Sequence, residues 1–250
     1  MNRKRHSTID ILRGITIISM ILYHGMWDIV YIHNVDIPWF DSLIGGIWQQ
    51  SIAWSFVLIS GFCFSFGKKR IKSGLVLLLC SGVITLVTII FMPQQKIMFG
   101  VLTMLGSCVL IVHFLEKILE KINDIVGIIS SIIVFILIKN ISSGYVGIEG
   151  LFKIQMPKVL YINILTTYLG LPYKGFWSMD YYGVLPWIFL YIVGFYLYKF
   201  CERKKYMDNL DKIHIKVLEL VGKHSLIIYM LHQPIVYAIL SVVFYIMRRL

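Results

Sequence analysis

The sequence predicts an all-α fold, a polytopic bundle of transmembrane helices with seven full spans and one short re-entrant or interfacial segment. Of its 250 residues 58% are hydrophobic, and the mean hydropathy is +0.78, above the range of a typical soluble domain. The apolar residues form runs of about 17–22, the length that crosses roughly 30 Å of hydrocarbon as a helix. Because the runs are continuous rather than alternating, and because backbone in lipid must satisfy its own hydrogen bonds, they predict helices rather than a β-barrel.

The connections between these runs are short, so we expect one membrane domain over residues 1–250. The expected full spans are residues 11–32, 46–66, 73–92, 98–115, 125–141, 182–200 and 225–247. A weaker run at 157–171 gives the re-entrant or interfacial segment, which is tolerated where it is buried in protein or lines a cavity. A fold of eight spans, in which this run also crosses the membrane, is the alternative.

The positions of the lysines and arginines predict how the bundle is oriented. The net charge is +11, and basic residues gather at the N-terminus and after the second, fourth and sixth spans. They are Arg3, Lys4, Arg5, Lys68, Lys69, Arg70, Lys72, Lys117, Lys121, Arg203, Lys204, Lys205, Lys212, Lys216 and Lys223. With seven spans these segments share one side, so the positive-inside rule predicts a multi-pass cell-membrane protein with a cytoplasmic N-terminus. Eight spans would place the very basic segment 201–223 outside.

The composition also limits the classes of partner. A basic membrane face attracts anionic lipids or an anionic substrate, so membrane lipids are expected partners, and a homodimer is left open. No folded basic domain is present to bind nucleic acid, which excludes that class. The cysteines, Cys63, Cys80, Cys108 and Cys201, have no metal-binding spacing, so we expect reduced thiols and no metal.

The first span, DILRGITIISMILYH and the residues after it, carries ionisable side chains on one helical face. Arg13 and His24 are eleven positions apart, about three turns, and Asp10 and Asp28 lie near the same stripe. This places Arg13 near the cytoplasmic boundary and His24 near mid-membrane, where an ionisable group needs a cavity or a partner. Each residue also has a structural reading: Arg13 as a snorkelling anchor, Asp10 as a helix cap or Arg13 partner, His24 as a structural histidine, and Asp28 as a group that orients a neighbour.

A second polar stripe lies in the last span, HSLIIYMLHQP. Ser225, Tyr229 and His232 are spaced four and three apart, which puts them on one face. Helical rise gives His232 a depth similar to that of His24, so the two histidines predict a shared midplane site. Gln233 and Pro234 follow, and the proline frees a backbone carbonyl at the same level. A structural hydrogen bond is the alternative role of His232.

Two further patches lie outside these stripes. Asp180 and Tyr181 stand at the non-cytoplasmic entrance of the span at 182–200, as an acceptor-binding mouth or as part of an interfacial aromatic belt. Gly100, Thr103 and Gly106 have the small-residue spacing of closely packed helices.

At this point the motifs resemble known families. Arg13, ten residues and His24 together resemble the R-x10-H pattern of the membrane-bound acyltransferase-3 proteins. Five blocks occur in order over nearly the whole chain: IDILRGITIISMILYHGMWD, FVLISGFCFS, FGVLTMLGS, DYYGVLPW and GKHSLIIYMLHQPI. Together they resemble the catalytic membrane domain of heparan-α-glucosaminide N-acetyltransferase, in its small bacterial form. Two positions depart from the pattern. Thr103 stands where many bacterial relatives carry a histidine, and His33 is the nearest match to the catalytic histidine of the animal enzyme.

The resemblance implies transfer of an acetyl group from cytoplasmic acetyl-CoA to an amine or hydroxyl of an envelope sugar, a glycan or its lipid-linked precursor. It points to Arg13 and His24, with His33 as the second candidate for the catalytic histidine. Chemistry agrees, because a histidine suits deprotonation of an acceptor and the planar fork of an arginine suits a coenzyme A phosphate. Direct transfer and an acetyl-histidine intermediate both remain open.

The remaining candidates follow from their neighbours. Asp28 could orient His24, while His232 could supply an oxyanion donor. On the donor side we expect Asp10, Ser225 and Tyr229 beside Arg13, and on the acceptor side His33, Asp180, Tyr181 and Gln233. The alternative function is a transporter or proton-coupled permease with a midplane His/Asp site, although no inverted repeat supports it. A metal held by His24 and Asp28 is a weaker third reading, since one helix supplies only two ligands.

Overall fold

A computed structural model describes residues 6–67 and 69–249, without the side chains of 208 and 209. Within that part, seven helices are long and apolar enough to cross a membrane, which confirms the predicted all-α bundle. These candidate spans are Ser7–Ile32, Leu43–Phe66, Arg70–Phe91, Val101–Leu119, Asp124–Ser143, Val184–Arg203 and Ser225–Met247. The basic residues predicted to orient the bundle include Arg3, Lys4, Arg5 and Lys68, which lie outside the described residues.

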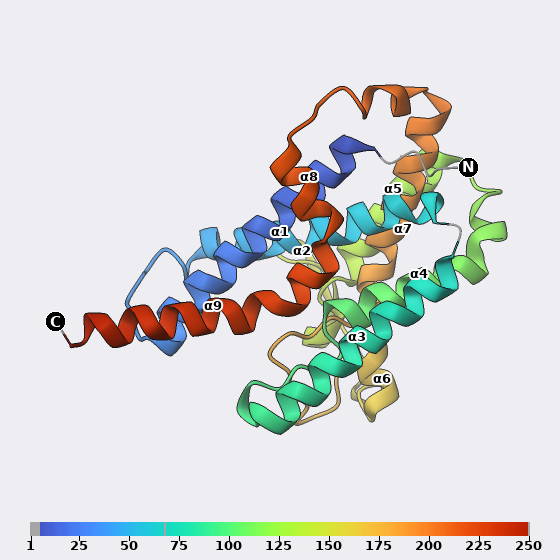
Figure 1. Cartoon of the computed structure of the whole chain (residues 1–250). Coiled ribbons are helices and arrows are strands. Elements are labelled where there is room, and N and C mark those ends of the chain that lie inside the picture. The colour runs from blue at the N-terminus through green and yellow to red at the C-terminus, as the bar shows by residue number, and fades with distance from the viewer. Residues whose placement is uncertain (1–5, 68, 250) are drawn as a thin grey trace. The chain divides into compact units, whose positions relative to one another are not determined.

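The elements follow in chain order (Figure 1). The helices are α1 (Ser7–Trp27), α2 (Leu43–Cys63), α3 (Arg70–Phe91), α4 (Val101–Leu119), α5 (Asp124–Ile138), α6 (Ile164–Leu169), α7 (Val184–Arg203), α8 (Lys216–Lys223) and α9 (Ser225–Met247). Strands β1 (Tyr145–Ile148) and β2 (Phe152–Gln155) form one antiparallel hairpin. A π-helical turn, η1 (Asp28–Ile32), continues α1, and short 3-10 turns cover Phe64–Phe66, Pro93–Gln95, Ile141–Ser143, Lys158–Leu160 and Tyr206–Asn209.

The chain forms two compact units. Unit 1 takes residues 1–59 and 205–250, and unit 2 takes residues 60–204. In unit 1 the first helix packs against the last two, because α1 contacts both α8 and α9. An apolar cluster of Ile17, Met20 and Ile52 lies at its centre.

Glycines bring the backbones of α1 and α8 together. A Cβ on Gly14 would overlap the carbonyl of Leu218, and a Cβ on Gly222 would overlap the carbonyl of Asp10. Close backbone approach of this kind is the usual role of small residues between membrane helices, where van der Waals packing rather than water exclusion drives association. The two contacts fix where α8 sits along the first turns of α1.

Helix α9 runs beside α1 in the same direction. His24 lies beside His232, Gly25 contacts Val236, and further along the chain the ring of His33 stacks on Phe244. Consecutive spans cross the membrane in opposite directions, so the first and last spans run in the same direction only when the total number of spans is odd. Unit 1 therefore agrees with seven spans and not with eight.

Unit 2 is a bundle in which α3 packs on α4 and α5 packs on α7. Gly74 and Gly106 face each other across the α3–α4 contact, which gives Gly106 the close-packing role that its spacing predicted. Tyr191 and Tyr196 of α7 are almost fully buried, and the ring of Tyr196 fills the space that Gly127 leaves on α5.

The weak run at 157–171 does not form a spanning helix. It contains a single 3-10 turn and the six-residue α6, which starts at a capping box formed by Asn163 and Thr166. The sequence had therefore correctly predicted a short element here. The β-hairpin just before it was not predicted, because its strands are only four residues long and continue no apolar pattern.

We predict that Gly222→Ala separates α8 from α1. The added methyl group has no room against the Asp10 backbone, so overpacking should cost about 1–3 kcal/mol of stability. Thermal unfolding of the detergent-solubilised protein measures this. Gly82→Ala in α3 is the matched control, because its Cβ meets no atom within 4 Å, and it should leave stability unchanged or higher. Equal stability of the two variants would contradict the close contact.

Candidate functional site

A π-helical turn at the end of α1 sets the geometry of the polar residues of unit 1. The α-helix is regular to Trp27, and the wider turn η1 begins at Asp28, whose side chain is fully buried. The wider turn changes the register of the residues after it relative to a regular helix, and His33 is its C-cap residue. Turns of this kind occur frequently at functional sites.

Two histidines and an acid–amide pair meet between α1, η1 and α9. The ring centroids of His24 and His232 are 4.8 Å apart. Beside them, Nε2 of Gln233 donates a hydrogen bond of 2.8 Å to Oδ1 of Asp28. Asp28 is thus held by the last span and not by His24. We call these four residues the midplane cluster.

Several polar atoms here are buried and face no partner in the described part of the chain. They are Oδ2 of Asp28, Nε2 of His232, Oε1 of Gln233 and Nε2 of the neighbouring His33. Buried polar groups in proteins are nearly always hydrogen-bonded, to protein, water or a ligand. These unpartnered acceptors and histidine nitrogens can therefore bind a small polar group that carries N–H or O–H donors.

The hydrogen bonds of His232 define its tautomer. Its Nδ1 lies 2.7 Å from the carbonyl oxygen of Tyr229, which can only accept, so Nδ1 carries the proton. In a neutral ring, Nε2 is then the basic nitrogen, and it is the atom that is buried without a partner. His232 is thereby prepared to accept a proton or a hydrogen bond at Nε2.

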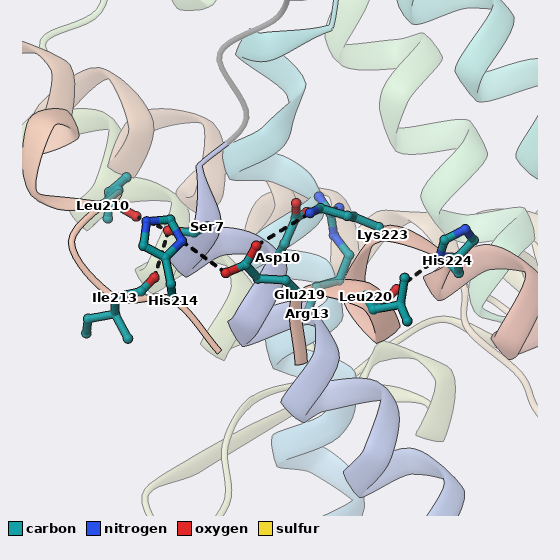
Figure 2. Close-up of polar contacts among 10 residues, drawn as sticks. All are labelled: Ser7, Asp10, Arg13, Leu210, Ile213, His214, Glu219, Leu220, Lys223 and His224. Atoms are coloured by element: carbon teal, nitrogen blue, oxygen red, sulfur yellow. Dashed lines mark hydrogen bonds and ion pairs between the residues drawn. The ribbon is translucent and has the colours of Figure 1, made fainter. Parts of the chain in front are cut away.

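The other end of α1 carries the predicted donor-side residues. Arg13 pairs with Asp10 at 3.3 Å, one turn apart on α1 (Figure 2). Because the N-cap of α1 is His6, Asp10 lies inside the first turn and is the arginine's partner rather than a cap. Oδ2 of Asp10 is buried with no hydrogen-bond partner among the described residues.

Helix α8 adds charged residues to this end that the sequence reasoning did not assign to the site. Glu219 pairs with His214 and with Lys223, as Figure 2 shows. The nitrogen–oxygen distances are 3.1 Å and 3.4 Å. The signal that could have found them is the short amphipathic segment KVLELVGK directly before the last span. Its charges lie near Asp10 because Gly222 contacts the Asp10 backbone.

The remaining unit 1 candidates are placed as follows. Ser225 is the first residue of α9. Tyr229 packs against the apolar cluster around Ile17 and Met20, with its ring centroid 5.6 Å from that of His232. Tyr229 therefore lies between the donor-side end and the midplane cluster along α9.

Asp180 and Tyr181 belong to unit 2, where both side chains have structural partners. Oδ2 of Asp180 accepts a hydrogen bond from the N–H of Val101 at the start of α4, and the hydroxyl of Tyr181 donates to the carbonyl of Thr167. The first contact holds the loop before α7 against the start of α4, and the second holds it against α6. Burial raises the pKa of Asp180 from 3.8 to about 6, opposed by the hydrogen bond from Val101.

Fold and site together describe a polytopic membrane protein with a buried cluster of two histidines, an aspartate and a glutamine inside one unit. Over residues 5–234 the chain matches the family described as heparan-alpha-glucosaminide N-acetyltransferase, catalytic. It belongs to that family and is therefore a multi-pass membrane acetyltransferase. No curated protein and no solved structure matches the chain. The family confirms the resemblance inferred from the motifs and favours acetyl transfer over the transporter alternative.

We predict a pH-dependent stability that Asp180→Asn removes. Because the pKa of Asp180 is higher in the folded chain than its ordinary 3.8, its stabilising contribution is present below pH 3.8 and lost as pH rises through about 6. Asparagine keeps an oxygen that can accept from Val101 but does not titrate. The stability of the variant relative to the wild type should therefore rise between pH 4 and pH 7, measured as the difference in Tm. A difference independent of pH would contradict the raised pKa.

Proposed function

We propose that this membrane acetyltransferase moves the acetyl group of cytoplasmic acetyl-CoA to an amine or hydroxyl of an envelope sugar, a glycan or its lipid-linked precursor. The observation that carries the proposal is the midplane cluster, in which His24 and His232 lie 4.8 Å apart beside the Asp28–Gln233 pair. The family supplies the acetyl-transfer class, and the cluster supplies groups that can move the proton which that reaction must remove.

In the proposed reaction His24 is the general base. A ring nitrogen of His24 takes the proton of the acceptor amine or hydroxyl as the acceptor attacks the thioester carbonyl carbon. The new C–N or C–O bond forms, the C–S bond breaks, and the thiolate of coenzyme A leaves and takes up a proton. In the alternative route a ring nitrogen of His24 first attacks the thioester, and coenzyme A leaves as an acetyl-histidine forms. The acceptor then attacks the acetyl-histidine, takes the acetyl group and releases the histidine.

The partners of His24 have distinct proposed roles. Asp28 and His232 complete the proposed catalytic set. Asp28 makes the site polar and holds the side chain of Gln233 in place by their hydrogen bond. Nε2 of His232 can accept a hydrogen bond from the acceptor or receive the proton that His24 removes. Gln233 and His33 lie next to this set with unpartnered buried atoms and are proposed to bind the acceptor. Asp180 and Tyr181 stay predicted acceptor-side residues, and no step of the reaction depends on them.

Acetyl-CoA is proposed to enter at the Arg13 end of α1. Arg13 presents a planar guanidinium that can bind a phosphate through two hydrogen bonds, and in the structure it pairs with the carboxylate of Asp10. About eleven residues of helix, roughly 16 Å, separate Arg13 from His24, so the extended arm of the donor would lie along α1 toward the midplane cluster. Ser225 and Tyr229, at the start of α9, are proposed to line that path.

We predict that His24→Ala lowers kcat for transfer of labelled acetyl groups by about 10²–10⁴, because a positioned general base contributes that much. His33→Ala, made in parallel, should keep most of kcat and raise the KM for the acceptor, because His33 is proposed to bind the acceptor. The reverse result would assign the base to His33. With acceptor left out, release of one coenzyme A per enzyme from the wild type but not from His24→Ala would establish the acetyl-histidine route. Wild-type transfer by His24→Ala would falsify the central assignment.

We also predict that Arg13→Ala raises the KM for acetyl-CoA by about 10–100-fold, with a smaller change in kcat. This is the loss of affinity expected when one hydrogen bond to a charged group is removed. Arg13→Lys should recover part of the loss, since it restores the charge without the fork. Steady-state kinetics with varied acetyl-CoA at saturating acceptor measures both. A fall in kcat with KM unchanged would place Arg13 in the chemical step instead of donor binding.

A further inference from the structure

Helix α8 lies at the boundary of the membrane. It is eight residues long, about 12 Å of helix, which is too short to cross the hydrocarbon. Its Gly222 contacts the Asp10 backbone in the first turn of one candidate span, and α9, another candidate span, begins two residues after α8 ends. A helix docked on the beginning of one span and leading directly into another must lie at the level where the bilayer meets water.

The docking on α1 fixes which face of α8 is free. Leu218 and Gly222 are turned toward α1, where their backbone contacts leave no room for rotation. On the opposite side Val217 is 70% exposed and Leu220 is 60% exposed. Ile213 and Ile215, just before the helix, are 57% and 46% exposed. The free face of α8 is therefore apolar.

Positive charge borders this apolar face. Lys216, the first residue of α8, lies next to Leu220 on the helical wheel. Lys212 lies four residues earlier in the chain, before the helix begins. Both lysines are exposed. Within the described residues 212–223 the single acidic side chain, Glu219, is turned toward His214 and Lys223 (Figure 2). Lys212 and Lys216 are thus left to face outward beside the apolar residues.

We propose that the free face of α8 binds anionic phospholipid, with Val217 and Leu220 among the acyl chains and Lys212 and Lys216 on the headgroup phosphates. An apolar face bordered by lysines is typical of helices that lie in the plane of an anionic membrane surface. Each lysine near such a surface adds electrostatic attraction, which salt weakens. A soluble phosphate compound would satisfy the lysines but not cover the apolar side chains.

The consequence reaches the donor-side end of α1. Because α8 touches the Asp10 backbone through Gly222, lipid held by α8 steadies the turn that carries Asp10 and Arg13. The proposal itself concerns lipid binding and does not depend on the acetyl-transfer chemistry proposed above.

Hydrogen exchange tests this on the whole chain, one molecule per nanodisc. In discs of phosphatidylcholine mixed with phosphatidylglycerol, amides of residues 213–223 should exchange on the order of tenfold more slowly than in phosphatidylcholine alone. Lys212→Gln with Lys216→Gln should abolish the difference, and the arginine pair at the same positions should retain it. Lys117→Gln with Lys121→Gln, a control pair in unit 2, should leave it intact. High salt should reduce it.

Other outcomes overturn the proposal. Equal exchange in both lipid compositions would mean that α8 needs no anionic lipid. Protection produced by coenzyme A in phosphatidylcholine discs, with no effect of phosphatidylglycerol, would assign the lysines to a soluble phosphate instead. Protection that appears only when two chains share a disc would assign the apolar face to a second copy.

Discussion

Helices α1 and α8 meet backbone to backbone, and unit 1 depends on that contact. Gly14 and Gly222 supply it by having no side chains, so α8 docks at one level on α1 and α9 begins at a fixed height beside it. Farther along the two parallel helices, the ring of His24 lies beside that of His232. The midplane cluster is therefore positioned by packing some three turns away from it.

The midplane cluster gathers polar groups that lipid would otherwise exclude. A carboxylate inside the hydrocarbon region of a membrane costs several kcal/mol unless it faces a partner or a cavity, and the amide of Gln233 supplies one partner to Asp28. The pairing leaves Oδ2 of Asp28 and Oε1 of Gln233 without partners in the described part of the chain. Buried polar atoms without hydrogen-bond partners thus occur at the site of the proposed chemistry, and functional sites are where proteins usually depart from full hydrogen bonding.

Much of this architecture could be predicted from residue patterns, because hydropathy over some twenty residues is a strong signal in lipid. Hydropathy predicted seven spans, and helical spacing predicted that Arg13 and His24 lie on one face of the first span. The match in depth between His24 and His232 followed from counting residues from each span's start.

Other features had no readable signal. The π-helical turn at Asp28 depends on tertiary packing, and regular helical spacing pairs Asp28 with His24 where the structure pairs it with Gln233. The structural partners of Asp180 and Tyr181 lie 79 and 14 positions away in the sequence, beyond any local pattern. Residue spacing predicts which side chains share a face of a helix, but it does not predict which side chain of another element each of them will bond.

Unit 1 joins residues 1–59 to residues 205–250, and this has a consequence for how the protein is made. The first span leaves the ribosome and enters the membrane long before α8 and α9 have been synthesised. During that interval Asp28 has no Gln233 to bond and Gly14 has no Leu218 against it. The first span must therefore wait in the bilayer, shielded by an insertion factor or by its neighbours, until residues 205–250 have been synthesised and complete its site.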